Sequence, residues 1–119
     1  ALYLIEHLKN LPGISFQRVD DPGSHAWYML AVKLDAKKAG IERDVLVSKL
    51  KEAEVEADIA WPTPIHLQPY YRETFGYKKG DFPISEKICS QVFQLPIQPF
   101  LTRNELERIV SVSRNILGN

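Results

Sequence analysis

Trp61-Pro62-Thr63-Pro64-Ile65-His66-Leu67-Gln68-Pro69 is the stretch around which the rest of this sequence is organised. Each of its three prolines fixes φ near about −65° and turns the preceding residue away from the helical conformation. We therefore expect a stiff, extended connector that holds the imidazole of His66 in one orientation. Gln68, Tyr70 and Tyr71 follow as possible hydrogen-bonding neighbours. The alternative is that His66 is a structural or surface residue.

The sequence before residue 35 predicts a helix followed by two strands. Residues 2–11 carry leucines at helical spacing, and the pair Pro12-Gly13 ends the element. Residues 14–19 are rich in β-branched and aromatic side chains and predict a strand, and residues 20–24 are turn formers. Residues 25–34 contain an unbroken apolar run, which predicts a strand covered on both faces and the most buried of the sheet.

A second helix and a third strand lead into the connector. After a polar loop at residues 35–40, residues 42–53 predict a helix whose charged residues, Arg43 among them, lie largely away from its apolar face. That face consists of Leu46, Leu50 and Ala53. Residues 55–61 alternate apolar with mostly acidic side chains, which is the period of a half-buried strand.

Three helical segments are expected beyond the connector. Pro69 opens a short helical turn over residues 70–75 that ends at Gly76. A longer helix follows Pro83, because four apolar residues recur at helical spacing: Ile84, Ile88, Val92 and Leu95. The capping-box sequence Thr102-Arg103-Asn104-Glu105 starts the final helix, and Gly118 ends it. The apolar face of this helix comprises Leu106, Ile109, Val110, Ile116 and Leu117.

This order predicts an α+β fold, with helices packed against a small, mostly antiparallel, three-stranded sheet. The third strand can lie parallel beside the second or antiparallel beside the first, and the sequence leaves both orders open. A chain of 119 residues has the size of one domain, which we place at residues 1–119. Because Ala1 already lies in an expected helix, we expect the chain to be a piece of something longer.

Composition and missing motifs exclude several functional classes. Fifteen basic residues balance fifteen acidic ones, so net charge favours neither nucleic acid nor an anionic membrane as a partner, and no apolar run reaches bilayer length. The single cysteine, Cys89, indicates a reducing, cytoplasmic setting and is expected as a small buried hydrophobe. The sequence has no glycine-rich phosphate loop, His-Glu-x-x-His or Gly-x-Ser-x-Gly motif. We therefore assign no catalytic residue and no metal site.

Three blocks of this sequence, in the same order, resemble the C-terminal small domain of the DegT/StrS-type sugar aminotransferases, which are fold-type-I pyridoxal-phosphate enzymes. Residues 61–71 match a pattern like Tyr-Pro-x-Pro-x-His-x-Gln-Pro-x-Tyr. Residues 80–86 match Gly-Asp-Phe-Pro-x-x-Glu, and residues 95–102 match Leu-Pro-x-x-Pro-x-Leu-Thr. Upstream, Arg43-Asp44 at the start of a helix resembles the Arg-Asp step of the family, and Trp27 to Lys33 resembles its central strand.

Two positions depart from the family pattern. Trp61 stands where the family usually has tyrosine, and the larger ring would change the shape of a substrate pocket. Glu54 stands where the family often has glycine before the third strand. A glutamate in the left-handed conformation that glycine accepts freely would carry a steric penalty.

The resemblance implies transfer of an amino group, usually from glutamate, to a keto group of a nucleotide-linked sugar, with pyridoxal phosphate as the cofactor. It also implies that the Schiff-base lysine and most cofactor contacts lie in a large domain that this chain lacks, so that the chain alone is expected to be inactive. His66 would help to hold the substrate, with Gln68, Tyr70, Tyr71 and Trp61 as neighbours.

The resemblance further implies a partner for this chain. The large domain would belong to the same or a separate chain, and the complete enzyme would be a homodimer with active sites shared between subunits. The alternative is a stand-alone, non-catalytic binding or interaction module derived from the same family. A docking domain should expose an unusually large apolar face, for which residues 2–11 are a candidate, and a self-sufficient module should not.

Overall fold

Three antiparallel strands form the sheet of this protein, in the order β1 (Ile14–Phe16), β2 (Leu30–Leu34) and β3 (Val92–Leu95). The computed structural model describes residues 1–21, 23 and 25–118, so Pro22 and Ser24 of the predicted turn at residues 20–24 lie outside the described residues. Ile14 pairs with Leu34, and Leu30 pairs with Leu95. The predicted α+β class with a three-stranded sheet is confirmed, and both strand pairs are antiparallel.

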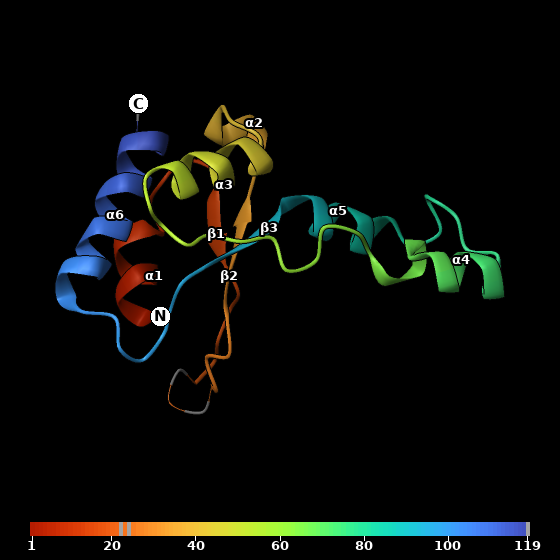
Figure 1. Ribbon diagram of the computed structural model, residues 1–119, viewed down its shortest axis with the longest axis horizontal. Coiled ribbons are helices and arrows are strands. Elements are labelled where there is room, and N and C mark those ends of the chain that lie inside the picture. The colour runs from red at the N-terminus through yellow and green to blue at the C-terminus, as the bar shows by residue number, and fades with distance from the viewer. Residues whose placement is uncertain (22, 24, 119) are drawn as a thin grey trace.

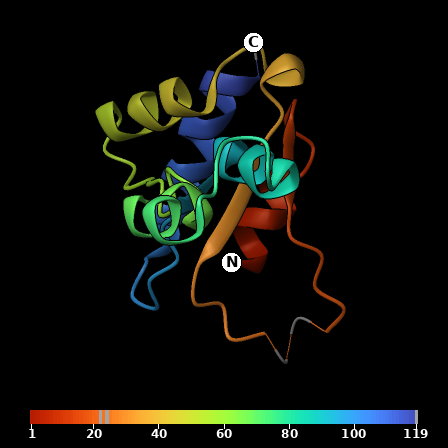
Figure 2. The same cartoon turned by 90° about the vertical axis from the view of Figure 1, so that its right-hand side faces the viewer.

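Helices and sheet form a body from which an arm projects (Figure 1). The body helices are α1 (Leu2–Leu8), α2 (Ala36–Ala39), α3 (Arg43–Glu52) and α6 (Arg103–Leu117). The arm, residues 61–91, contains the 3₁₀ turn η1 (Ile65–Leu67) and the helices α4 (Pro69–Phe75) and α5 (Pro83–Gln91). In Figure 2 the arm points toward the viewer, in front of the body.

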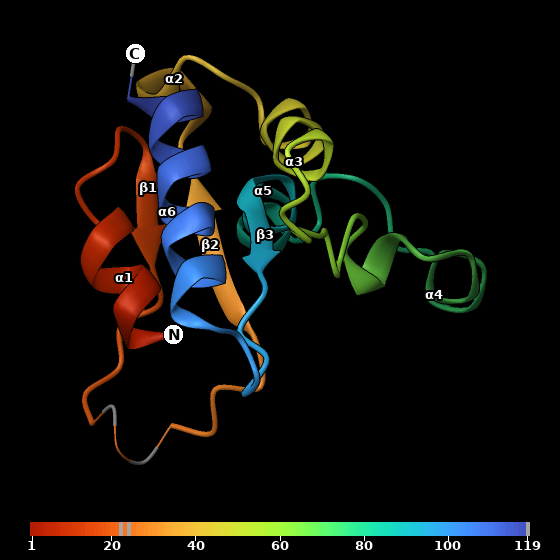
Figure 3. The ribbon, with the colours of Figure 1, turned by 60° about the vertical axis from the view of Figure 1, so that its left-hand side comes forward.

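The core lies where α1, α3 and α6 pack together and against the sheet. Figure 3 shows α6 in front of the sheet, beside α1. The most enclosed side chains are Leu4, Val32, Leu34, Leu46 and Leu50. The capping box predicted for α6 is present, since Thr102 Oγ1 accepts the Glu105 N–H and the Glu105 carboxylate accepts the Thr102 N–H. Pro69 and Gly76 bound α4, also as predicted.

The predicted strand over residues 25–34 is shorter and less covered than expected. Only residues 30–34 pair in the sheet, with Leu30, Val32 and Leu34 buried on one face and the alternate residues half-buried. Before them, Trp27 has a φ of 48°, which a strand does not allow, and Tyr28 is 89% exposed. The apolar run therefore contains one strand buried on a single face, preceded by irregular backbone.

The third strand is not where the sequence placed it. Residues 55–59 alternate in burial as expected, with Val55 and Ala57 buried, but Trp61 is 58% exposed. The described residues of this segment pair with the sheet only through one bridge, between Asp58 and Gln94. Beyond this bridge the chain leaves the sheet to form the arm (Figure 1). The strand that completes the sheet is β3, which lies in the second half of the helix predicted to follow Pro83.

That helix prediction was wrong beyond Gln91, and the predicted loop at residues 35–40 was wrong as well. Helix α5 ends at Gln91, and its first two stripe residues, Ile84 and Ile88, are 79% and 42% exposed instead of packed. In the supposed loop, Asp35 caps the short helix α2 by accepting the N–H groups of Lys37 and Lys38. No described helix is long and apolar enough to cross a membrane.

The arm gives the molecule more surface than its mass predicts. The accessible area is 8074 Å², about 1,500 Å² more than the ~6,600 Å² expected for a monomer of this mass. The radius of gyration is 15.7 Å, against about 13.5 Å for a compact domain of this length. The excess area exceeds the ~800 Å² that each partner buries in an interface of standard size.

Candidate functional site

The centre of the proline-rich connector is a 3₁₀ turn and not the extended backbone that the sequence predicted. Leu67 N–H donates to the Pro64 carbonyl, and Gln68 N–H donates to the Ile65 carbonyl, each at 3.0 Å. Residues 65–67 do not precede a proline, so nothing prevents them from turning. Gln68, which does precede one, keeps the extended conformation with φ −66° and ψ 146°.

The turn places His66 in an enclosed position at the side of α5. The residue is only 8% exposed, and its Nε2 lies 3.1 Å from Oε1 of Glu86. The ring centroid of Phe82 lies 4.8 Å from that of the imidazole, and the ring of Tyr77, with its centroid at 6.5 Å, is nearly perpendicular to the imidazole. The imidazole is therefore held by a carboxylate and by aromatic rings from the following turn.

Glu86 is an ionised acceptor at neutral pH. The Gly80 N–H, 2.7 Å from Oε1, is the largest cause that lowers the pKa of this carboxyl below its ordinary value of 4.5. Partial burial opposes the shift, and His66 and the Phe82 N–H add to the lowering. Because a carboxylate can only accept, the shared proton belongs to Nε2 of His66.

Beside His66 lies an open hollow of about 430 Å³ with a mostly apolar lining. Its lining residues come from both sides of the arm: Trp61, Thr63, Pro64, Ile65, His66, Tyr71, Tyr77, Phe82, Ser85 and Cys89. Cys89, predicted to be buried, is half-buried and faces this hollow. A volume of this size accommodates a small molecule or part of a larger one.

The structure brings together three of the five predicted substrate-binding residues. Trp61, His66 and Tyr71 all line the hollow. Gln68 and Tyr70 lie outside this lining. The Gln68 side chain is exposed and donates to the Thr63 carbonyl at 3.4 Å, and Tyr70 is 65% exposed with its ring edge-on to Tyr71.

Three further residues at the site were missed by sequence reasoning. Tyr77, Phe82 and Glu86 surround His66, and the rings continue outward through Phe75 to Tyr71. Phe82 and Glu86 belong to the block at residues 80–86, so a signal was present. Nothing local, however, indicates that a glutamate contacts a histidine twenty residues earlier.

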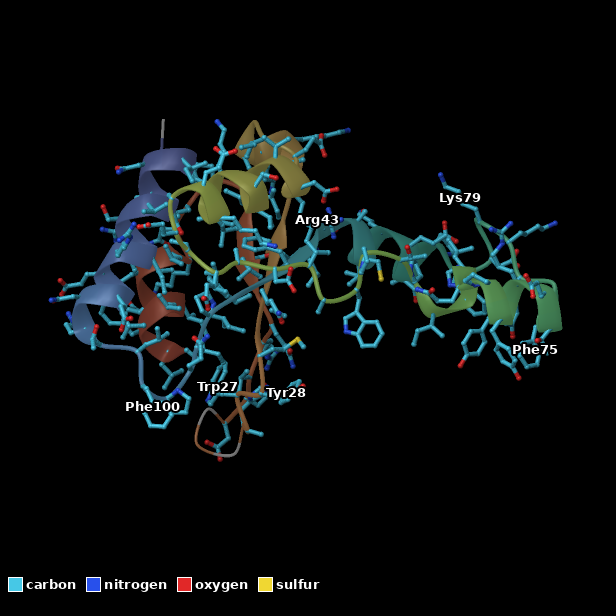
Figure 4. The ribbon with its side chains drawn as sticks, in the orientation of Figure 1. Trp27, Tyr28, Arg43, Phe75, Lys79 and Phe100 are labelled. Atoms are coloured by element: carbon cyan, nitrogen blue, oxygen red, sulfur yellow. The ribbon has the colours of Figure 1, made fainter. Side chains whose placement is uncertain are left out.

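Arg43 fixes the base of the arm to the body, where Figure 4 shows it between α3 and α5. Its Nη1 donates to the carbonyls of Cys89 and Val92, the latter at 3.0 Å, and its Nε pairs with Asp44 at 2.6 Å. Only 8% of the residue is exposed, which corrects the prediction that Arg43 lies on the charged face of α3. Arg43 therefore provides hydrogen bonds to backbone carbonyls at the junction between helix α5 and strand β3.

The sequence profile of the DegT/DnrJ/EryC1/StrS aminotransferase family matches residues 1–114. The chain belongs to this family. The resemblance carried by the three sequence blocks is thereby confirmed.

Relatives in the DegT/DnrJ/EryC1/StrS family are considerably longer than this chain. It is 37% identical over 110 residues to the dTDP-3-amino-3,6-dideoxy-alpha-D-galactopyranose transaminase of Aneurinibacillus thermoaerophilus, a match that covers 92% of this chain and 28% of the relative. It is 30% identical over 109 residues to the spore coat polysaccharide biosynthesis protein SpsC of Bacillus subtilis, again with 92% and 28% coverage.

A solved structure of the same type has the same fold. S. venezuelae DesV, crystallised in complex with a ketimine intermediate, superposes with a TM-score of 0.83 at 28% identity. The match covers 99% of this chain and 30% of DesV. The chain thus spans a little under a third of the length of the family members that it matches.

Within this chain, the hollow does not fit the cofactor that the family uses. Neither a lysine to form a Schiff base nor a carboxylate to face a pyridine nitrogen is among its lining residues. The described residues also contain no group of three or more His, Cys, Asp or Glu side chains placed to hold a metal ion.

Proposed function

We propose that residues 1–119 form the small domain of a pyridoxal-phosphate-dependent aminotransferase that transfers an amino group to a keto group of a nucleotide-linked sugar. Family membership supports the aminotransferase class. Two relatives named as a dTDP-3-amino-3,6-dideoxy-alpha-D-galactopyranose transaminase and a UDP-4-amino-4-deoxy-L-arabinose–oxoglutarate aminotransferase support the sugar substrate. The remaining two thirds of such an enzyme, in the same or a separate chain, would supply the large domain and the cofactor site.

The exposed arm is the observation that favours a docking domain over a stand-alone module. Eight of the twelve exposed large hydrophobic side chains among the described residues lie within residues 61–88. They are Trp61, Ile65, Tyr70, Tyr71, Phe75, Phe82, Ile84 and Ile88. Exposed apolar side chains concentrated on one part of a soluble protein are typical of a binding surface. The partner that we propose to cover it is the large domain.

Helix α1 is not this surface, although residues 2–11 were the predicted candidate. Leu4 and Leu8 are buried, and the helix packs against α6 inside the body. Leu2, at 54%, is its exposed large hydrophobic residue. The docking surface that we propose therefore lies on the arm.

In this proposal the arm carries substrate-positioning residues to a cleft whose other wall belongs to the large domain. His66 would bind a polar group of the nucleotide-linked sugar, with Trp61 and Tyr71 shaping the hollow around it. Gln68 and Tyr70, on the exposed side of the arm, would contact the substrate from its rim. Holding the sugar in one orientation and excluding water is the contribution of this chain, because positioning alone accounts for large rate effects.

The chemistry of amino transfer would lie outside this chain. Pyridoxal phosphate, when bound by the large domain, supplies an electron sink for the carbon that exchanges its amino group. We include in the proposal a homodimer with shared active sites and a cytoplasmic location. The latter is consistent with a single free cysteine in the sequence.

The test uses the complete protein that contains this chain, supplied with 2-oxoglutarate and one of two nucleotide-linked amino sugars. These are dTDP-3-amino-3,6-dideoxy-α-D-galactose and UDP-4-amino-4-deoxy-L-arabinose, and the glutamate formed is measured. The substitution His66→Asn should lower kcat/KM for the sugar by about 10- to 100-fold, with the cofactor absorbance and the unfolding temperature unchanged. His7→Asn, on α1 in the body, is the matched control and should leave the rate unchanged.

Two results would count against the proposal. Turnover of neither amino sugar, in a protein that binds no pyridoxal phosphate, would favour the stand-alone module. A loss of stability in the His66→Asn protein that matches its loss of activity would show that His66 is a structural residue.

A further inference from the structure

Glu86 holds His66 by a contact that defines the orientation of the imidazole. One carboxylate oxygen, Oε1, accepts both the Nε2–H of His66 at 3.1 Å and the Gly80 N–H at 2.7 Å. The side chains of His66 and Glu86 are only 8% and 16% exposed. Because Glu86 lies in α5 and Gly80 in the preceding turn, the acceptor is fixed from two directions.

The opposite ring nitrogen of His66 is left open. With the proton on Nε2, the neutral imidazole has an acceptor at Nδ1. Among the described residues, the one buried side-chain nitrogen or oxygen without a hydrogen-bond partner is Oε1 of Gln91. His66 Nδ1 makes none of the hydrogen bonds observed here, so it is not sealed inside the protein. His66 lines the hollow, so a molecule bound there is the partner that we consider for Nδ1.

We propose that Glu86 is a positioning residue: it keeps His66 protonated on Nε2 so that bare Nδ1 accepts a hydrogen bond from a hydroxyl or amino group of the substrate. This inference rests on the proposed function, because it requires a nucleotide-linked sugar in the hollow. The substrate group at Nδ1 is thereby identified as a donor. An analogue with that donor removed should lose as much rate as the enzyme loses with the imidazole removed.

Carboxylate-to-histidine contacts of this kind are an established way to fix a ring. In metal sites and catalytic triads, a carboxylate bonded to one ring nitrogen sets which nitrogen is free to act. Here Glu86 would serve the same purpose for substrate binding. Its backbone contact to Gly80 also holds the turn that carries Tyr77 and Phe82 against the imidazole.

A double-mutant cycle in the complete protein tests whether Glu86 acts through His66. Glu86→Ala and His66→Ala should each lower kcat/KM for the amino sugar by about 10- to 100-fold. The kcat/KM of the double variant should lie within about twofold of that of the less active single variant, because the two side chains act as a unit. Glu86→Gln keeps an oxygen acceptor for both donors and should restore most of the rate. Lys87→Ala, an exposed neighbour on the same helix, is the control.

A spectroscopic measurement reads the ring directly. With ¹⁵N-labelled histidine at about pH 9, well above the ordinary pKa of histidine side chains, the His66 ring should show a protonated Nε2 and a bare Nδ1. In the Glu86→Ala protein, this pattern should change to a mixture of both tautomers. This test does not depend on activity and applies to the wild-type protein even if Glu86→Ala fails to fold.

The possible outcomes separate the two proposals. If His66→Ala leaves sugar turnover intact, the proposed role of His66 fails, and the positioning role of Glu86 fails with it. If His66→Ala is impaired while Glu86→Ala is not, or if the two losses multiply, only the inference about Glu86 fails. A proton found on Nδ1 in the wild-type protein would overturn it as well.

Discussion

Glu54 adopts a left-handed backbone conformation, with φ 58°, at the end of α3. The sequence comparison suggested this strain, because the family often has glycine here. Arg108 partly offsets the energetic cost of this conformation. Its guanidinium pairs with the Glu54 carboxylate and donates to the Ala53 carbonyl at 3.1 Å. The conformation costs about 1 to 2 kcal/mol, and an exposed ion pair returns at most about 1 kcal/mol.

Glu54→Gly should therefore stabilise the protein by about 0.5 to 1 kcal/mol, because relief of the backbone outweighs the lost ion pair. Chemical denaturation measures the free energy of unfolding. Glu56→Gly, two residues further along and without a positive φ, is the matched control and should destabilise by about 0.5 to 1 kcal/mol. Equal destabilisation by both substitutions would show that the ion pair dominates.

Glu86 should make stability depend on pH in the acidic range. Its folded-state pKa lies below the ordinary value of 4.5, chiefly because of the Gly80 N–H. A lowered carboxyl pKa contributes stability that is fully present above 4.5 and is lost as the pH falls through the folded value. In the Glu86→Gln protein, the decline in unfolding free energy between about pH 6 and pH 3 should be shallower. An unchanged slope would contradict this assignment.

The buried polar contacts of individual side chains could not be predicted from the sequence. Arg43 lies between Glu42 and Asp44 in a helix, so local pattern placed it in solvent. Its burial depends on carbonyls 46 and 49 residues further along the chain. His66 was identified as the central residue of the connector, but its partner Glu86 was not. Hydrophobic periodicity and secondary-structure propensity describe residues that are close in sequence. They could not predict these contacts, because the contacts join residues far apart in the chain.

At the scale of the elements, Arg43 determines how the arm joins the body. Replacing it with methionine keeps the buried length of the side chain and removes the donors to the Cys89 and Val92 carbonyls. Arg43→Met should cost about 2 to 3 kcal/mol, because hydrogen bonds from a charged group are lost and two carbonyls lose their partner. Amide exchange at residues 88–92 should rise more than exchange elsewhere in the sheet.

The control for Arg43 is Lys49→Met on the same helix, which removes an exposed charge and should change stability by less than about 0.5 kcal/mol. An effect of Arg43→Met as small as that of the control would mean that the α5–β3 junction holds without the guanidinium. Uniform exchange across the chain would instead indicate global destabilisation.

The cap of α6 offers a second prediction about an element. Thr102→Ala removes the side chain that accepts the Glu105 N–H and should destabilise by about 1 kcal/mol. Thermal unfolding compared with Ser111→Ala, an exposed position within the same helix, isolates the contribution of the cap. A loss shared equally by the two variants would show that the capping box contributes nothing measurable.

The elements with strong end signals were predicted, and the elements defined by tertiary pairing were not. Proline at the start and glycine at the end bounded α4, and a capping box located the start of α6. For β3, by contrast, Val92 and Leu95 continued a helical stripe that began at Ile84. Strand pairing with β2 overrode that stripe, and in the extended conformation of residues 92–95 the alternate side chains Phe93 and Leu95 are buried.

At the scale of the whole molecule, the arm exposes apolar side chains to solvent. The large domain that we propose, packed along residues 61–91, would account for the exposed apolar side chains and the excess accessible area. It would also account for the chain spanning under a third of the length of its relatives. In the same arrangement, the hollow beside His66 would lie at the boundary between the two domains, where ligand sites commonly occur.

This arrangement predicts that Ile84 has opposite environments in the isolated chain and in the complete protein. Because Ile84 is 79% exposed, Ile84→Ser should change the unfolding free energy of the isolated chain by less than about 0.5 kcal/mol, measured by chemical denaturation. In the complete protein, where we expect the side chain to be buried, the same change should cost about 1.5 to 3 kcal/mol of unfolding free energy.

The control is Val45→Ser, on the exposed side of α3 in the body, which should have the same small effect on stability in the isolated chain and in the complete protein. If Ile84→Ser is equally harmless in both proteins, the large domain does not cover this part of the arm, and the arm would instead have to serve a partner outside the enzyme.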